Sequence, residues 1–285
     1  MSESFILTLS CIDHPGIVAR VAGTLARLGA NIRAAEQFED SQAGAFFMRV
    51  QFGLLDERNL PKVEEAIAEA GADHGMEWKI RRASERKRVI LLASKFDHCL
   101  TDLLYRSRTN DLMIDIVAIV SNHPREVYAH LDLGDIPFHH LPVTKETKAE
   151  QEGKLRAIID ATNADLVVLA RYMQVLSDDL TSHLAGRCIN IHHSFLPGFK
   201  GAKPYHQAHA RGVKLIGATA HFVTADLDEG PIIEQDVERV THRDTPEDLV
   251  RKGRDIERRV LARAVRAYVE DKVLINGKTT VVFHS

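Results

Sequence analysis

The sequence predicts an α/β protein with two domains: an N-terminal ferredoxin-like β-α-β-β-α-β domain and a C-terminal domain on a mostly parallel, doubly wound sheet. Three observations lead to this prediction. The 285 residues exceed the usual length of one domain, and 45% of them are apolar, which is enough for two cores. The hydrophobic pattern also changes across R-R-A-S-E-R-K at 81–87, where no apolar residue is larger than Ala. We therefore expect domains at 1–82 and 88–285, joined by a linker at 83–87.

The first domain is expected to combine four strands with two helices. In chain order these are a strand at 4–10, a helix that begins near Asp13 and ends at Gly29, a strand from about Asn31, a strand at 46–52, a helix at 60–70 and a strand at 76–81. Asp13 is expected to cap the first helix, with Pro15 in its first turn, because both residue types favour a helix start.

The second domain is expected to alternate strands with helices. Short, continuous apolar runs predict strands at 88–93, 114–120, 166–170 and 188–191, with helical stretches such as 99–108 and 146–162 between them. Two further strands at 215–223 and 231–240 precede a long amphipathic helix at 247–268. In sheets of this kind, ligands bind beyond the carboxyl ends of the strands, and the 190–194 stretch occupies such an end.

Composition excludes several classes of partner. A formal net charge of -3 gives no general attraction to nucleic acid or to an anionic membrane. The three cysteines, Cys11, Cys99 and Cys188, are widely spaced, which is typical of small buried thiols in a reducing compartment. The N-terminus lacks the features of a signal peptide, and no apolar run reaches membrane length. We expect a cytoplasmic protein.

Asn190, His192 and Asp228 form the strongest candidate site. They stand in N-I-H-H-S-F-L-P and in D-L-D-E-G-P, at strand ends or in adjacent loops. An amide can hydrogen-bond a developing oxyanion, an imidazole can carry protons near neutral pH, and a carboxylate can orient imidazole or water. No Ser or Cys stands nearby in an elbow motif, so direct attack on a bound carbonyl is favoured over a covalent intermediate.

The surroundings of these residues carry a family resemblance. The N-I-H, S-F-L-P and D-E-G-P segments follow in order, with G-A-K-P-Y-H and G-A-T-A-H-F-V between them. The chain thereby resembles the folate-dependent formyl-transfer family, whose motif runs Asn-x-His, Ser-x-Leu-Pro, Asp-x-Gly-Pro. The resemblance implies that Asn190, His192 and Asp228 are catalytic.

The same resemblance implies a folate pocket at A-R-Y-M-Q-V-L, 170–176, which matches the family's stretch at a strand end. Met173, Val175 and Leu176 are expected to contact the pterin, because a flat apolar heterocycle needs an apolar slot. Packing in the core is the competing explanation for Met173 and Leu176.

The acceptor distinguishes members of this family. Related transferases hold the phosphate of their acceptor with a Gly-Ser-Asn loop, whereas the corresponding segment here, 94–99, has no glycine and contains Asp97. Formylation of a transfer RNA would need a basic extension, and little chain remains for one.

We therefore expect hydrolysis of 10-formyltetrahydrofolate to tetrahydrofolate and formate. The folate is the substrate and no cofactor is expected. Supply of formate for purine synthesis and balance of the folate pools both stay open as roles.

The first domain resembles ACT domains through D-H-P-G-I at 13–17 and G-A-N-I at 29–32. This implies a homo-oligomer with an amino-acid effector, for which glycine or methionine is the expected ligand and Asp13, Gly16 and Asn31 are the candidate contacts. Helix capping by Asp13 and a turn at Asn31 would explain these residues without a ligand.

Fifteen histidines suggest a metal site, yet no tetrahedral set is evident among pairs such as 139–140, 192–193 and 206–209, and none is expected. His98 and His123, at predicted strand ends, are second-rank site candidates. Two rival functions remain: a formyltransferase with another amine acceptor, and an amino-acid sensor on an inactive folate-binding domain.

Overall fold

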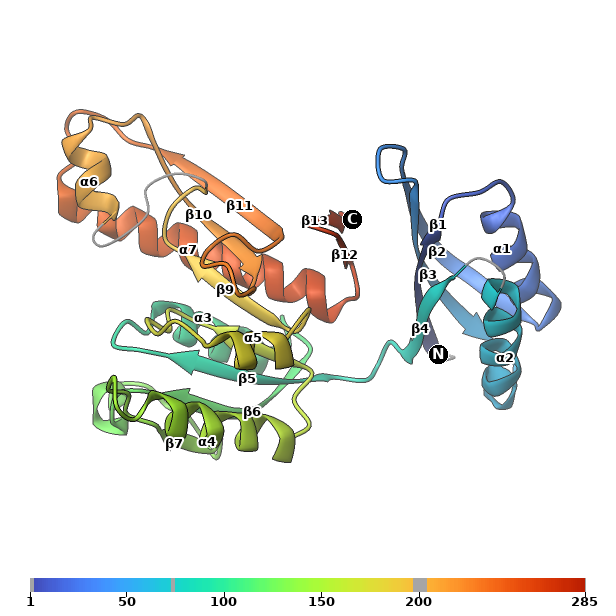
Figure 1. The fold of residues 1–285 in the computed structure, drawn as a ribbon, viewed down its shortest axis with the longest axis horizontal. Coiled ribbons are helices and arrows are strands. Elements are labelled where there is room, and N and C mark those ends of the chain that lie inside the picture. The colour runs from blue at the N-terminus through green and yellow to red at the C-terminus, as the bar shows by residue number, and fades with distance from the viewer. Residues whose placement is uncertain (1–2, 73–74, 197–203, 285) are drawn as a thin grey trace. The chain divides into compact units, whose positions relative to one another are not determined.

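The computed structural model describes residues 3–72, 75–196 and 204–284 (Figure 1). Its contacts divide the chain into two compact units. One comprises Met1–Arg86 with Glu270–Leu274 and Val281–Ser285, and the other comprises Lys87–Val269 with Ile275–Thr280.

The first unit is a four-stranded antiparallel sheet with two α-helices, as the sequence predicts. Its elements are β1 (Ser4–Ile12), α1 (Ile17–Arg27), β2 (Ala30–Asp40), β3 (Ala45–Leu54), a 3₁₀ turn η1 (Glu57–Asn59), α2 (Leu60–Gly71) and β4 (Glu77–Arg82). The strand order is β2-β3-β1-β4, with every pairing antiparallel. Alternate residues of β1, such as Phe5 and Leu7, are fully buried and join a core with Val21 and Leu25 of α1. This confirms the ferredoxin-like topology.

The start of α1 differs from the prediction. Gly16 is the N-cap, with φ 96° and no side-chain hydrogen bond, so the expectation that Asp13 caps the helix was wrong. The reason is that the backbone N–H of Asp13 donates to the carbonyl of Gly44 (2.9 Å), which holds Asp13 three residues before the cap. Asn31 is likewise the second residue of β2, because the turn is made two residues earlier at Gly29, with φ 76°.

Two C-terminal segments pack in the first unit, whereas the expected second domain ran unbroken to residue 285. Arg49, 5% exposed, donates from Nε to the carbonyl of Glu270 (3.1 Å) and pairs with Glu36 (3.2 Å). Arg81 forms an ion pair with Asp271. Such long-range pairings are absent from any local hydrophobic pattern, which is why the sequence did not indicate them.

The second unit carries the long seven-stranded sheet. Its elements are β5 (Lys87–Ala93), α3 (His98–Arg108), β6 (Ile114–Ser121), the 3₁₀ turn η3 (Arg125–Tyr128), β7 (Phe138–His140), α4 (Lys148–Ala161), β8 (Leu166–Leu169), α5 (Asp178–His183), β9 (Cys188–His192), α6 (Pro204–Ala210), β10 (Leu215–Phe222), β11 (Ile232–Arg239) and α7 (Pro246–Val269). A separate hairpin of β12 (Val273–Asn276) and β13 (Thr279–Val282) follows. The sequence did not predict the short elements β7, α5 and α6 or this hairpin.

The strand order of the large sheet, β11-β10-β9-β8-β5-β6-β7, confirms a doubly wound, mostly parallel sheet. Strands β5 to β9 pair in parallel, and β10 is antiparallel to both of its neighbours. The chain leaves β5 toward β6 and later returns to its other side at β8, so the order reverses there. A crevice is expected beyond the carboxyl ends of the strands at such a switch point.

Helices cover both faces of this sheet (Figure 1). Ile90 and Leu92 of β5 pack in one core with Leu155 of α4 and Leu180 of α5. Their neighbour Leu91 is also fully buried and points to the opposite face. Helices α3 and α7 pack against each other, and α7 lies along β9, β10 and β11. These continuous apolar strands are therefore explained by burial on both faces.

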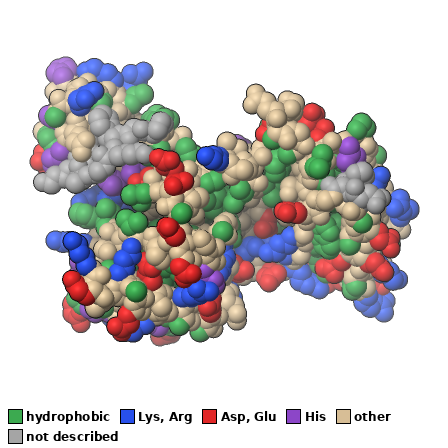
Figure 2. Space-filling view, in the orientation of Figure 1, with side chains coloured by type: hydrophobic (Ala, Val, Ile, Leu, Met, Phe, Trp, Pro, Cys, Tyr) green, Lys and Arg blue, Asp and Glu red, His purple; other side chains and the backbone are tan. Residues whose placement is uncertain are grey.

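Among the described residues, none of the helices combines the length and the apolar composition needed to span a membrane. On the face shown in Figure 2, acidic and basic side chains are interspersed over both units.

Candidate active site

A cavity of about 700 Å³ opens in the second unit at the carboxyl ends of β5, β8 and β9. Asn190, His192 and Asp228 all line it, as does the whole segment from Arg171 to Leu176. The cavity therefore lies where the reversal of strand order predicts it, and it brings together the residues that the sequence indicated as catalytic and as folate-binding.

Strand pairing places the polar groups. Asn190 stands opposite Leu169 of β8 on one side and opposite His221 of β10 on the other. His192 Nδ1 lies 3.2 Å from Asp228 Oδ2, and the two side chains are 7% and 16% exposed. An imidazole and a carboxylate 36 residues apart in the chain are thus in contact.

The loop that carries Asp228 is held by a close backbone approach. A Cβ at Gly230 would lie 1.8 Å from the carbonyl oxygen of Phe222, so only glycine fits there. Phe222 in turn donates its N–H to the carbonyl of Pro231 (2.9 Å). Asp228 itself has a left-handed conformation, with φ 58°. The Gly-Pro pair of D-E-G-P therefore closes the loop that presents Asp228.

His221 lines the cavity, although it was not among the site residues predicted from the sequence. It is 2% exposed and lies beside a register shift between Ala220 and His221. Its Nδ1 donates to the carbonyl of Phe222 (2.8 Å), while Nε2 lies 3.2 Å from Asn190 Nδ2 and 3.6 Å from Asp228 Oδ1. His221 therefore links the amide and the carboxylate. The G-A-T-A-H-F-V motif was the signal that could have found it.

The two histidines keep Asp228 ionised. Burial opposes its ionisation, but the contacts with His192 and His221 outweigh this effect and hold the pKa of Asp228 well below its usual range. His192 Nε2 has no hydrogen-bond partner among the described residues, although it is buried. A ligand in the cavity can therefore bond to Nε2, while Nδ1 stays on Asp228.

The Ser-Phe-Leu part of the motif has a structural role. Thr219 of β10 donates to the carbonyl of Ser194 (3.0 Å) and accepts from the N–H of Leu196 (3.1 Å). Gln235 donates to Thr219 Oγ1 (2.9 Å) and to the carbonyl of Leu196 (3.2 Å). These bonds fix the chain that leaves β9 just after His192 and His193.

The three residues of the predicted folate slot differ in their exposure. Met173 and Val175 are 53% and 55% exposed although they line the cavity, whereas Leu176 is 8% exposed and belongs to the core of the sheet. Ser94 Oγ accepts from the N–H of Met173 (3.0 Å) and so joins the loop after β5 to the slot. Exposed apolar side chains in a concave wall are suited to a flat ligand.

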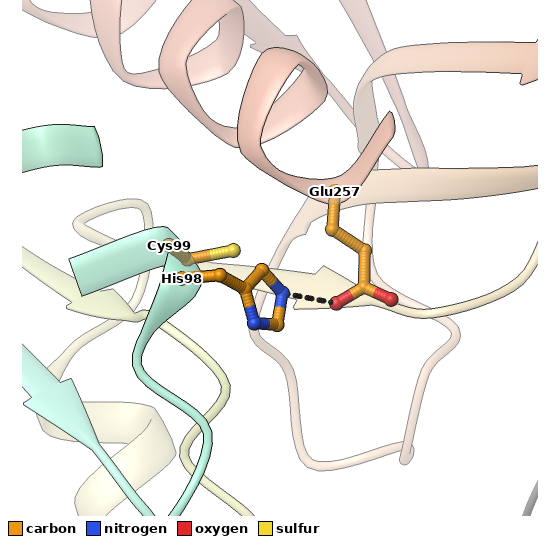
Figure 3. A group of neighbouring side chains, drawn as sticks. All are labelled: His98, Cys99 and Glu257. Carbon is orange, nitrogen blue, oxygen red and sulfur yellow. Dashed lines mark hydrogen bonds and ion pairs between the residues drawn. The ribbon is translucent and has the colours of Figure 1, made fainter. Parts of the chain in front are cut away.

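A second polar cluster in the cavity wall surrounds Glu257 of α7. Figure 3 shows the imidazole of His98 pointing at this carboxylate, with the thiol of Cys99 beside it; their ligand atoms lie within 4.8 Å of one another. A metal site would need the thiolate, but burial and the charge of Glu257 raise the pKa of Cys99 well above its ordinary value. Arg171 Nε already lies 3.2 Å from the carboxylate. Glu257 is thus already paired with His98 and Arg171, so the cluster fits a group of mutually paired side chains better than a metal site.

The remaining candidates lie outside the cavity. His123 donates its backbone N–H to Ser121 Oγ (2.9 Å) and is not among the lining residues. Asp13 and Gly16 lie between β1 and α1, and Asn31 is exposed at the start of β2. The three cysteines are buried and free, as the sequence indicated.

Comparison with known proteins agrees with this architecture. A family model described as formyl transferase matches residues 87–265, and an ACT domain model matches residues 5–72. The fold and the cavity thus define a formyl-transferase-type catalytic domain joined to an ACT domain. Over 285 residues the chain is 49% identical to a formyltetrahydrofolate deformylase of a Corynebacterium species, with 99% of each chain covered.

Solved structures extend the likeness. A formyltetrahydrofolate deformylase from Burkholderia mallei superposes with a TM-score of 0.93 at 50% identity, covering 99% of this chain and 100% of that one. A glycinamide ribonucleotide transformylase from Symbiobacterium toebii has a TM-score of 0.64 at 29% identity, covering 70% of this chain and 95% of that one. The chain belongs to the formyltetrahydrofolate deformylase family.

Proposed function

We propose that the protein hydrolyses 10-formyltetrahydrofolate to tetrahydrofolate and formate, with Asn190, His192 and Asp228 as the catalytic residues. The observation that carries this proposal is their shared cavity, which places the His192–Asp228 pair (3.2 Å) beside the exposed apolar side chains of Met173 and Val175. The names of the full-length relatives support it.

Asn190 and His192 bind the formyl oxygen in this mechanism. The amide donates a hydrogen bond that strengthens as the oxygen gains charge, and Nε2 of His192 is the second donor when the imidazole is protonated. Asp228 holds His192 through Nδ1, so the ring keeps one orientation throughout the reaction.

Water then attacks the formyl carbon. Asp228 takes the proton of the attacking water, directly or through its pair with His192, as the new C–O bond forms. The C–N10 bond breaks as N10 receives a proton, and formate and tetrahydrofolate leave. Water balances the reaction, so the proposal assigns no cofactor to it.

The folate is proposed to lie against Met173, Val175 and Leu176. Met173 and Val175 present uncovered apolar surface to the cavity, while Leu176 supports the loop from the core. Truncation of Met173 to Ala is expected to weaken folate binding more than it slows bound turnover.

Formate release by the purified protein, with 10-formyltetrahydrofolate and no amine, tests the proposal directly. Stoichiometric formate and tetrahydrofolate are expected, with the combined variant Asn190→Ala and His192→Ala as the inactive control. Formyl transfer that occurs only after an amine is added would support the transferase alternative instead.

The residues at 1–82 are proposed to act as a regulatory and oligomerising domain, linked by 83–87 to the catalytic part. The ACT match supports an amino-acid effector, and we propose glycine or methionine at Asp13, Gly16 and Asn31. Gly16 has φ 96° and open space where a Cβ would lie, so its backbone is accessible to a ligand.

Calorimetry with each amino acid checks this proposal, with Asn31→Ala as the binding-site variant. Heat from neither ligand would leave oligomerisation as the domain's role, to be measured by sedimentation.

A further inference from the structure

A buried carboxylate that the proposed mechanism does not use stands in the wall of the same cavity. Glu257 is 1% exposed. Its Oε2 lies 2.9 Å from His98 Nε2 and 3.2 Å from Arg171 Nε, and its Oε1 accepts from the hydroxyl of Tyr205 over 2.7 Å. The partners come from α3, the loop after β8 and α6. We call these four side chains the Glu257 wall (its His98–Glu257 contact is drawn in Figure 3).

The negative charge of Glu257 is compensated by the neighbouring side chains of the wall. Burial opposes ionisation of Glu257, but the hydrogen bond from His98 and the positive charge of Arg171 outweigh it and lower the pKa of the carboxyl. Burial raises the pKa of Tyr205, so its hydroxyl stays protonated and donates. Both oxygens of Glu257 are therefore occupied, and a cation that enters the cavity meets a carboxylate that is already neutralised.

Ring contacts connect the Glu257 wall to the catalytic groups. The ring centroids of His192 and His193 are 5.2 Å apart, and those of His193 and Tyr205 are 6.4 Å apart. Gly253, one turn before Glu257 on α7, makes room for Tyr205, because a Cβ there would lie 2.1 Å from the ring. His193 therefore connects His192 to Tyr205 of the wall, which is closely packed at Gly253.

We propose that the Glu257 wall determines acceptor specificity: it limits the space beside the formyl carbon and withholds the carboxylate that an amine acceptor would need, so that water alone reacts. This inference rests on the proposed hydrolysis. A primary amine is mostly an ammonium ion near neutral pH, and it attacks only after a base at the site takes a proton. Water is smaller and enters uncharged. A related transformylase shares the fold of the catalytic domain, so the backbone alone does not explain the choice of acceptor.

Opening the wall should therefore admit an amine. In that reaction the amine nitrogen bonds to the formyl carbon, the C–N10 bond breaks, and one proton passes from the amine to N10. The balance needs no oxidant, no reductant and no further partner.

The experiment uses the full-length protein with 10-formyltetrahydrofolate and glycinamide as the amine, and it measures formate and formylglycinamide in the same reaction. The wild-type protein is expected to release formate at a rate that glycinamide does not change, with no detectable formylglycinamide. In each of the variants His98→Ala and Tyr205→Ala, the share of formylglycinamide among the products is expected to exceed the detection limit by about tenfold or more. His183→Ala is the matched control, because His183 also contacts a carboxylate, Asp160 (2.9 Å), but lies outside the cavity lining.

The other outcomes would contradict either this inference or the proposed hydrolysis, and the measured products distinguish the two. Formylglycinamide from the wild-type protein would overturn it without any variant. Formate as the sole product of both variants would overturn it as well. Loss of all turnover in folded variants would show that the wall serves the chemistry itself and not the choice of acceptor. A wild-type protein that releases no formate would overturn the proposed hydrolysis, which is a separate failure.

Discussion

At Asp228, one carboxylate contacts two imidazoles. Oδ2 lies 3.2 Å from His192 and Oδ1 lies 3.6 Å from His221, and the side chain is 16% exposed. The charge of Asp228 therefore acts on two rings: it orients His192, the proposed substrate contact, and it helps to hold His221, which lies beside Asn190. We therefore expect changes at Asp228 to affect turnover more than binding, because in the proposed mechanism Asp228 acts on the catalytic groups and not on the pterin.

Asp228→Asn is expected to lower the rate of hydrolysis by about 10²- to 10⁴-fold, because the amide cannot take a proton from water. Affinity for tetrahydrofolate should change little, since the apolar slot is intact. Single-turnover kinetics and calorimetry measure the two quantities separately. Near-normal turnover in this variant would contradict the role given to Asp228.

His221 is expected to act as a positioning residue. His221→Gln keeps an amide near the Nε2 position, whereas His221→Asn keeps one near Nδ1, where the bond to the carbonyl of Phe222 is made. The Asn variant should lose about 10- to 100-fold in kcat with little change in KM, because Asn190 and Asp228 lose their common partner. The Gln variant should retain more activity. Equal loss in both, accompanied by lower thermal stability, would indicate a purely structural role.

Among the elements, helix α7 both packs against the large sheet and contributes a side chain to the cavity wall. It covers β9, β10 and β11 with one face and presents Glu257 to the cavity, with Gly253 one turn earlier. Glycine in a helix interior normally costs about 1 kcal/mol relative to alanine, so its presence here needs a reason. That reason is the ring of Tyr205, which occupies the space of a Cβ.

Gly253→Ala is therefore expected to destabilise the protein by about 1–3 kcal/mol through overpacking, despite the better helix propensity of alanine. Gly153 of α4 is the matched control, because a Cβ added there would have no atom within 4 Å, and Gly153→Ala should stabilise by about 0.5–1 kcal/mol. Urea unfolding of both variants tests the pair. A stabilising Gly253→Ala would show that Tyr205 can move aside at little cost.

For the molecule as a whole, stability should depend on pH through a histidine next to the site. Burial and the nearby charge of Arg171 lower the pKa of His193 from 6.5 to about 4. Between about pH 4 and 6.5, the unfolded chain binds this proton and the folded protein does not. The contribution of His193 to the free energy of unfolding is therefore complete above about pH 6.5 and is lost as the pH falls toward 4.

This loss should be on the order of 1–3 kcal/mol for His193 alone. Urea unfolding at pH 7.5 and at pH 4.5 measures it, with His193→Gln as the reference that cannot take up the proton. The wild-type protein should lose more stability than the variant between the two values of pH. Equal losses would show that His193 is protonated as readily in the folded state.

Local patterns in the sequence were sufficient for much of this protein. Hydrophobic periodicity predicted the order of the longer strands and helices in both domains, because burial on one face or on both is reflected in neighbouring residues. Asn190, His192 and Asp228 were predicted to be catalytic because each stands in a short motif. Predictions at the ends of elements were weaker: Asp13 was expected to cap α1, and a backbone bond to Gly44 moved the cap to Gly16.

Only the tertiary structure decided which distant side chains meet. His98 and Glu257 are 159 residues apart, and nothing near either one indicates the other. His221 joined the site because β9 and β10 pair in a particular register, which sets Asn190 opposite it. Strand order, register and helix packing depend on contacts summed over the whole domain, so the residues that prepare the catalytic groups became visible only in three dimensions.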